Sequence, residues 1–543
     1  MQFSPPKAPA GARGMRLART MALVATILCL SGNFARTAVF QYSLVTPTKK
    51  GGRDAFLWIP PEAPKVRGLV LGGMTLMERE FAKDAVIRKA CAEVGVGILF
   101  LKTGLRSVNL QAVLDQFAKH SGYGEISTAP LFFIGHSAGG PQARDCARQW
   151  HERCFGLFQF RGLGPGGEEP VPPGVPALMI VGQFDEFGKI GRSADDVENW
   201  EKDRDYMTQY RRLHPANLGS FLVEPGAGHF AWSDRCAAYL GKFLVKAAKA
   251  RIPEDFPRQP LRDVDPASGH LTDLYGIRRP GHPPAPYPAY AGDKSRAAWH
   301  FDREIAEATI AFHEGIGRAD QFLRWKDDHW VQSGARNFLT DVQWVADGQT
   351  FQVFPAYAGT YPGPHKGRGS VWAKAGQPVG ASDAPIRVRP VSGPLVSAGK
   401  HRLRFQYDEL APAEENRRVT FLAYSPGDAR RRYAERVGMF MEKHYRLDEG
   451  RPQNLTFQAI GSLRPDSPPV KLRATSDAGL PVEFHLGYGP AVIEDGHLRL
   501  VEIPVRAKFP LELKVVAYQF GSGLPPKTQR AAPISQTVTI KGP

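Results

Sequence analysis

Short apolar runs alternate with longer amphipathic stretches between residues 40 and 250. The apolar runs predict strands at residues 54–60, 67–73, 97–102, 130–136, 155–160, 177–183 and 220–225. The amphipathic stretches predict helices at residues 79–94, 109–120, 140–154, 199–213 and 232–250. Continuous apolar strands separated by helices are typical of a parallel sheet that is covered on both faces. We therefore predict an α/β domain over residues 40–250.

The pattern changes beyond residue 250. Residues 251–295 are crowded with Pro and Gly, which indicates a linker or an irregular segment that wraps over the surface. Residues 296–447 contain one helix-like stretch followed by short strand-like segments. We predict a mixed, mostly β module of unknown role there, with a two-residue hairpin turn at Asp347-Gly348. Residues 452–543 alternate apolar and polar positions between turn residues, which predicts a separate β-sandwich.

The first 35 residues and the overall charge bear on location and partners. Four basic residues between positions 7 and 19 precede an apolar run at residues 21–32, which is short for a membrane span and fits a secretory signal peptide. An uncleaved anchor is the alternative. The net charge is +16, but Lys and Arg are scattered among acidic residues, so we expect no nucleic-acid partner. These features predict a secreted, periplasmic or cell-surface protein.

The cysteines depend on that location. In an oxidising compartment Cys91, Cys146, Cys154 and Cys236 allow up to two disulfides. Free buried thiols are the equally weighted alternative. The cysteines show no C-x-x-C spacing, so we expect no metal site.

The candidate chemistry begins at LFFIGHSAGG, residues 131–140, where an apolar strand runs into a G-x-S-x-G pentapeptide and then a helix. In a nucleophile elbow the serine lies at the tip of a strained turn, and the residues two before and two after it must be small. Gly135 and Gly139 meet that requirement. We therefore predict Ser137 as a nucleophile at the carboxyl edge of the sheet, and His136 as a packed neighbour.

A serine hydroxyl is a weak nucleophile, so a base must accept its proton and a carboxylate must orient that base. Asp185 follows one predicted strand, and His229 follows the next in a glycine-rich loop. We predict that Asp185 orients His229, the alternative for His229 being a cap on the following helix. Other acidic residues close to Asp185 are Glu186, Asp195 and Asp196.

A tetrahedral intermediate needs two backbone N–H donors for its oxyanion. Ala138 supplies one because it follows the nucleophile. We expect Met74 to supply the other, with Thr75 as the alternative, from the loop that begins at Gly72-Gly73. Phe230 and Trp232 follow the predicted base and are candidates to line the acyl pocket, ordinary packing being the alternative.

Together these motifs resemble the α/β-hydrolase superfamily, and residues 40–250 are most similar to compact secreted esterases of the feruloyl esterase and polyhydroxyalkanoate depolymerase type. The resemblance implies a mostly parallel sheet, a catalytic triad of Ser137, Asp185 and His229, and no cofactor. The loop LGGMTL departs from it by lacking the histidine that often precedes the oxyanion glycine. In this fold Cys91 and Cys236 would flank the same side of the sheet, which allows a disulfide between them.

The short stretch between Ser137 and Asp185 leaves no room for a large lid, which implies an open site and a bulky, polymeric or carbohydrate-linked ester substrate. Residues 454–541 resemble bacterial immunoglobulin-like repeats, which implies a spacer or contact with a cell surface or polysaccharide. The sequence thus predicts a secreted serine hydrolase that cleaves carboxylic esters through an acyl-enzyme. A serine peptidase or amidase on the same fold, and an inactive binding or scaffold protein, remain the alternatives.

Overall fold

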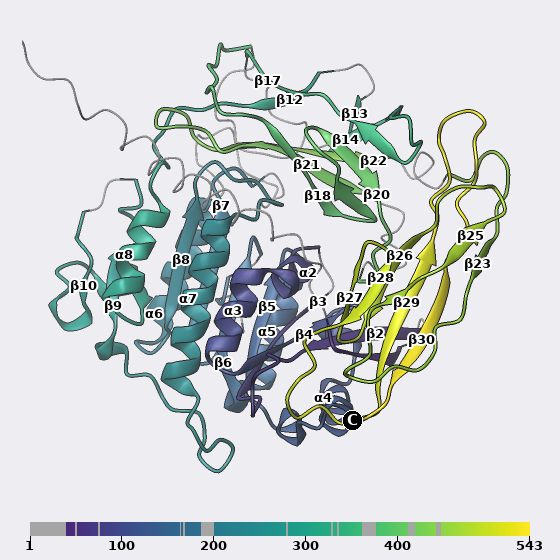
Figure 1. Ribbon diagram of the computed structural model, residues 1–543. Coiled ribbons are helices and arrows are strands. Elements are labelled where there is room, and N and C mark those ends of the chain that lie inside the picture. Colours follow the sequence, from purple (N-terminus) through teal and green to yellow (C-terminus); the bar gives the residue numbers. More distant parts are fainter. Residues whose placement is uncertain are drawn as a thin grey trace, which may run out of the picture. The chain divides into compact units, whose positions relative to one another are not determined.

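The computed structural model describes most of the chain beyond the leader (Figure 1). The described residues are 40–48, 51–73, 76–162, 164–166, 169–185, 200–278, 281–326, 330–333, 336–360, 376–410, 419–440 and 447–543. The predicted leader, Met74 and Thr75 lie outside these ranges, and so do Glu186, Asp195 and Asp196. Within them, no helix combines the length and apolar character that a membrane span requires.

Eight strands form the main sheet in the order β1-β2-β4-β3-β5-β6-β7-β8. They are β1 (Tyr42–Thr48), β2 (Gly51–Trp58), β3 (Gly68–Gly73), β4 (Val96–Leu101), β5 (Leu131–His136), β6 (Cys154–Phe160), β7 (Ala177–Gly182) and β8 (Gly219–Glu224). β1 and β2 are antiparallel to their neighbours, whereas β3 to β8 pair in parallel. The seven predicted strands are therefore confirmed, and β1 adds an edge that the sequence pattern did not reveal.

Helices cover both faces of this sheet, as its apolar strands require. One face shares its core with α4 (Leu110–Ser121), α5 (Gly139–Gln149) and α6 (Trp200–Leu213). The other shares its core with α2 (Leu76–Lys83), α3 (Ala85–Glu93) and α7 (Asp234–Arg251). The single helix predicted at residues 79–94 is wrong, because the Asp84 carboxylate accepts hydrogen bonds from Val86 N and Ile87 N and caps a new helix. Strand order and layering are those of the α/β-hydrolase fold.

The Pro- and Gly-rich segment forms a small sheet of its own, in the order β10-β9-β11. Its strands are β9 (His270–Asp273), β10 (Ala285–Pro286) and β11 (Ala297–His300), and α8 (Arg303–Phe312) follows. Leu271 and Trp299 pack with Leu218, which precedes β8. The predicted boundary between the linker and the next module lay between residues 295 and 296. β9 and β10 precede that boundary and β11 follows it, so the small sheet spans it.

Residues 319–440, called the β-module below, contain two larger sheets. The five-stranded sheet is β13-β14-β22-β21-β18, with β13 (Trp330–Ser333), β14 (Arg336–Leu339), β22 (Ala434–Phe440), β21 (Thr420–Ser425) and β18 (Arg387–Ser392). The four-stranded sheet is β15-β16-β20-β19, with β15 (Gln343–Trp344), β16 (Thr350–Gln352), β20 (Arg402–Phe405) and β19 (Leu395–Ser397). β12 (Leu323–Trp325) pairs with β17 (Pro355–Tyr357). Phe351, Phe405, Phe421 and Phe440 belong to one buried core that both larger sheets share.

The predicted hairpin at Asp347-Gly348 forms, but its turn is longer than two residues. Val345 N donates to Thr350 O at 2.8 Å, which leaves residues 346–349 in the turn. The Asp347 carboxylate accepts hydrogen bonds from Gln349 N and Thr350 N and thereby stabilises the longer loop.

The remaining strands form three antiparallel sheets. Their orders are β23-β25, β24-β28-β27 and β26-β29-β30. Their bounds are β23 (Leu455–Phe457), β24 (Val470–Lys471), β25 (Ala474–Ser476), β26 (Glu483–Tyr488), β27 (Ala491–Glu494), β28 (His497–Leu500), β29 (Leu511–Tyr518) and β30 (Ile534–Ile540). Leu513, Val538 and Ile540 are buried. Antiparallel strands with an apolar face suit a β-sandwich, and the immunoglobulin-like resemblance stays a prediction.

Cys91, Cys146, Cys154 and Cys236 are all buried and free, so the disulfides allowed by the sequence are absent. Cys91 lies on α3 and Cys236 on α7, and both join the core on one side of the sheet as expected. Their thiols have different neighbours, because Cys91 lies beside Arg88 and Cys236 hydrogen-bonds with Ser233 and Glu224. Burial raises the pKa of Cys91 to about 12, which makes it unreactive.

Candidate active site

The elbow between β5 and α5 has the geometry that its sequence predicts. Ser137 has a φ of +52°, a strained value for a residue with a side chain. A Cβ on Gly135 would lie 2.3 Å from Gly139 O, and one on Gly139 would lie 2.2 Å from Glu78 Oε1. The Gly135 position therefore excludes any side chain, whereas a side chain at Gly139 would displace the Glu78 carboxylate. Ser137 is half-buried and Ala138 is exposed, so the hydroxyl and the following amide lie at the surface of the fold.

Glu78, a buried carboxylate on α2, lies beneath this elbow. Its Oε1 accepts a hydrogen bond from His136 N at 2.8 Å. Its aliphatic part fills the space beside Gly72, where an added Cβ would come within 3.2 Å of Glu78 Cγ. Glu78 thus joins α2, the end of β3 and the elbow. No sequence prediction covered Glu78, whose only signal is an acidic residue between apolar ones in the amphipathic stretch after the Gly72-Gly73 loop.

Asp185 and His229 come together from the loops after β7 and β8. Nδ1 of His229 lies 2.9 Å from both carboxylate oxygens of Asp185. The His229 side chain is only 6% exposed and that of Asp185 only 12%, so little water competes for the contact. A carboxylate at Nδ1 favours the tautomer whose Nε2 accepts a proton.

His136 links the elbow to the loop that carries His229, residues 225–233, called the base loop below. Its Nε2 lies 3.1 Å from the backbone oxygen of His229, and the two imidazole rings lie 4.8 Å apart. Burial, together with the charge of His229, holds the pKa of His136 well below its usual value, so this ring stays neutral. A neutral ring can donate Nε2–H to the His229 oxygen. The residue that precedes Ser137 therefore anchors the backbone of the predicted base.

A buried ion pair lies at the start of the base loop. Arg161 follows β6, and its guanidinium crosses Gly182 of β7 to reach the carboxylate of Glu224 at the end of β8. A Cβ on Gly182 would lie 2.7 Å from Arg161 Nη1, so glycine permits this crossing. Glu224 also accepts a hydrogen bond from Ser233 Oγ at 2.5 Å. Burial alone would raise the pKa of Glu224, but Arg161 and Ser233 lower it below its usual value.

Glu224 and Ser233 stand at the two ends of the loop that carries His229. Their hydrogen bond fixes the span of that loop, and Ser233 also caps α7 through Cys236 N at 3.2 Å. No sequence prediction covered this network. Its only signal is a charged residue at the end of each of two apolar strands.

The two aromatic residues after the base have different surroundings. Trp232 Nε1 donates to Asp84 Oδ2 at 3.0 Å, and its ring packs 4.5 Å from Phe81. The packing alternative therefore describes Trp232. The Phe230 ring lies 5.0 Å from that of His229, at an interplanar angle of 89°, and is half-buried. Phe230 thus remains beside the predicted base.

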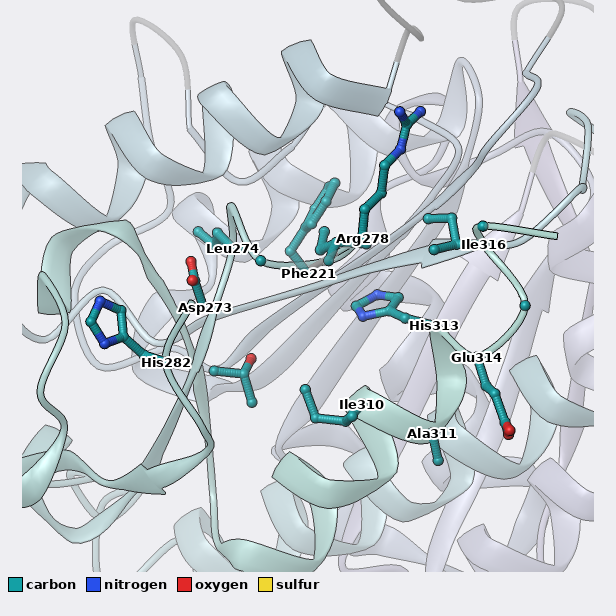
Figure 2. A pocket seen from close by; sticks show the side chains of 15 residues that line it. Phe221, Asp273, Leu274, Arg278, His282, Ile310, Ala311, His313, Glu314 and Ile316 are labelled. Carbon is teal, nitrogen blue, oxygen red and sulfur yellow. The ribbon is translucent and has the colours of Figure 1, made fainter. Parts of the chain in front are cut away.

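A separate cavity of about 450 Å³ lies between the segment after β9 and the end of α8 (Figure 2). Asp273, Arg278 and Glu314 provide its charged groups, and Phe221 of β8 contributes to its wall. His313 also lines it, but its Nε2 already accepts a hydrogen bond from Val223 N at 3.1 Å. None of the predicted site residues that the structure describes lines this cavity. Among the described residues, no group of three or more His, Cys, Asp or Glu is arranged to hold a metal.

Comparison with known proteins gives only distant likenesses. No protein-family model matches the chain, and no curated sequence gives a match. An α/β serine hydrolase homologue from Coxiella burnetii is 16% identical with a TM-score of 0.27, and the match covers 38% of this chain and 98% of that one. The esterase domain of a Rhodothermus marinus protein is 17% identical with a TM-score of 0.27, over 38% and 97% of the two chains. The strand order and the elbow, rather than these likenesses, define the fold.

Proposed function

We propose that the protein is a serine hydrolase of the α/β-hydrolase fold. Ser137 is the nucleophile, His229 accepts its proton at Nε2, and Asp185 orients His229 through Nδ1. The observation that carries the proposal is the Asp185–His229 contact at 2.9 Å, on a loop that His136 ties to the strained turn of Ser137. A strained elbow and a buried carboxylate–imidazole pair both cost stability, which favours a catalytic role over a scaffold.

The reaction that we propose has two halves. In the first, Ser137 Oγ attacks a carbonyl carbon, and the proton taken by His229 passes to the leaving group as an acyl-enzyme forms. In the second, His229 deprotonates a water molecule, whose oxygen attacks the acyl carbon. The bond between that carbon and Ser137 Oγ then breaks, His229 returns the proton to Oγ, and the carboxylic acid leaves. The backbone N–H of Ala138 donates to the oxyanion, with Met74 or Thr75 as the second donor.

For the substrate we propose a carboxylic ester, polymeric or carbohydrate-linked, met outside the cytoplasm. The exposed position of Ala138 supports access by a bulky acyl group. Contact of residues 452–543 with a cell surface or polysaccharide belongs to the same proposal and rests on the apolar-and-polar strand pattern alone. Amide and peptide substrates are the alternative because the same residues catalyse their cleavage.

A fluorophosphonate probe tests the nucleophile directly. The wild type should be labelled, and Ser137→Ala should lose labelling and activity on p-nitrophenyl esters. Ser107→Ala is the matched control, because Ser107 is an exposed serine whose hydroxyl donates to Thr103 O in a short helical turn. Labelling that persists in Ser137→Ala would contradict the assignment, and an unlabelled wild type would favour the scaffold alternative.

A further inference from the structure

The five-stranded sheet of the β-module has two different faces. Phe421 and Ala423 of β21 point into the module's own core. Leu422 of β21 and Val437 of β22 instead join the core beneath α2, α3 and α7. Because side chains alternate along a strand, residues with the register of Leu422 and Val437 face the hydrolase domain. We call this side the inner face.

Polar residues of the inner face continue beyond its apolar part. Glu435 pairs across the strands with Tyr424, and Tyr433 lies two residues before Glu435, so these three side chains share that face. The rings of Tyr424 and Tyr433 stack at 6.2 Å, and Tyr433 Oη donates to Glu435 Oε2 at 2.8 Å. Arg389 of β18 reaches over the Tyr424 ring at 6.0 Å. A polar surface of the β-module with its own hydrogen bond and ring contacts is thus directed toward the hydrolase domain.

This surface contacts the loop that carries His229. Arg389 Nη2 donates to the backbone oxygen of Phe230, the next residue after His229, at 3.0 Å. Gly226, with a φ of +73°, passes so close to Tyr433 that an added Cβ would lie 2.1 Å from Tyr433 O. Residues of the β-module therefore contact the base loop on both sides of His229. They lie far along the chain, since Arg389 is 159 positions after Phe230.

The loop that carries Asp185 has a parallel set of contacts. The Arg432 guanidinium lies 3.6 Å from the ring centre of Phe184, and its Nε donates to Asp320 Oδ1 at 2.7 Å. Gln183 connects the two loops, because its Oε1 accepts from Gly226 N at 2.8 Å while its Nε2 donates to Ile316 O at 3.2 Å. Ile316 also lines the cavity of Figure 2, so that loop forms part of the same support.

We propose that Arg389 and Arg432 are positioning residues that hold the His229 and Asp185 loops in register, so that the catalytic centre is completed by the β-module. This inference rests on the proposed function. The β-module thereby supports the acid and the base, whereas Ser137 is supported within the hydrolase domain. The short stretch between Ser137 and Asp185 predicts no large lid, but the β-module contacts the loops that carry His229 and Asp185.

Kinetics of full-length variants test this proposal. Arg389→Met removes the donor to Phe230 O, and Arg389→Lys keeps a cationic donor. Arg387→Met is the matched control, since Arg387 is exposed and lies two residues earlier on β18. We expect Arg389→Met to lower kcat on a p-nitrophenyl ester by about 10- to 100-fold with KM little changed, the scale of a small misplacement of catalytic groups. Arg389→Lys should recover part of kcat, and Arg387→Met should match the wild type.

Phe184→Leu is the second variant, because it removes the ring beneath Arg432 while keeping an apolar side chain. It should also lower kcat rather than raise KM, and thermal unfolding of every variant identifies any that fail to fold. Wild-type kcat in both Arg389→Met and Phe184→Leu would overturn the proposal, as would a loss confined to KM or a lysine variant no better than the methionine one. A wild type that the fluorophosphonate probe does not label would overturn the proposed function as well, and that failure is visible before any variant is made.

Discussion

Ser137 and His229 lie on turns that are stabilised by different means. The turn of Ser137 is held by close packing of its own backbone, by the buried carboxylate of Glu78 and by a hydrogen bond from Ser137 N to Phe160 O. The loop of His229 depends on the Arg161–Glu224 pair below and on Arg389 and Tyr433 from the β-module. The first turn is thus held within the hydrolase domain, whereas the second also depends on the β-module.

The difference predicts how each turn should fail. Close packing of backbone allows no adjustment, so a single methyl group in the elbow should act on folding and activity together. The base loop has several independent attachments, so the loss of one should shift His229 without unfolding the domain. The predictions that follow test this contrast.

The largest effect is expected at Gly135. Gly135→Ala places a Cβ 2.3 Å from Gly139 O, and neither backbone segment can move without displacing Ser137. We expect activity to be lost and the free energy of unfolding to fall by more than about 3 kcal/mol. Denaturant unfolding and fluorophosphonate labelling measure the two effects. Gly124→Ala is the control, because a Cβ there meets nothing within 4 Å, and a similar loss in that variant would refute the explanation.

The next effect, a loss of stability with the elbow left intact, is expected when the ion pair beside the base loop is broken. Arg161→Met leaves the buried Glu224 carboxylate without its cation, which should cost about 3–5 kcal/mol of unfolding free energy. The double variant Arg161→Met/Glu224→Leu should be more stable than the single variant, because no charge is left buried. Urea titrations of both variants decide the point. If the double variant were less stable than Arg161→Met, the loss of stability could not be explained by the unpaired buried charge of Glu224.

These contacts also show why only part of the site could be predicted from the sequence. The elbow and the strands follow from local patterns, because apolar runs, glycines and Ser137 lie within ten residues of one another. The Arg161–Gly182–Glu224 crossing becomes visible only once β6, β7 and β8 are known to be neighbours. The role of Arg389 could not be predicted for the same reason. Alternating side chains show that β18 has two faces, but they do not show which element packs against its inner face.

The effect of acid comes next in size. Burial lowers the pKa of His136, and lowers those of His300 and His313 to about 3 and that of His485 to about 4. The unfolded chain binds these protons near pH 6.5 and the folded chain only far below it, so stability is full above pH 6.5 and falls as the pH drops toward about 3. Each histidine contributes a slope of up to about 1.4 kcal/mol per pH unit.

His313→Gln isolates one such contribution, because an amide oxygen can replace Nε2 as the acceptor for Val223 N. Between pH 6.5 and 4.5 this variant should lose roughly 2 kcal/mol less stability than the wild type. The exposed residue His120 supplies the control, since His120→Gln should leave the pH dependence unchanged. An unaltered slope in His313→Gln would mean that His313 is accessible to protons in the folded protein.

The smallest effect is expected at Trp232. Variants there distinguish a packing role behind the base loop from direct contact with the substrate. Trp232→Phe keeps the aromatic contact with Phe81 but removes the hydrogen bond to Asp84, a loss of about 1 kcal/mol. Asp84→Ala should cost about 1 kcal/mol more, because Asp84 also caps α3. Neither variant should change KM, since Trp232 packs against the aromatic rings of Phe81 and Phe160 in the core. A changed KM for Trp232→Phe would instead place Trp232 in the acyl pocket, and support for the base loop would then have to come from the β-module and the ion pair alone.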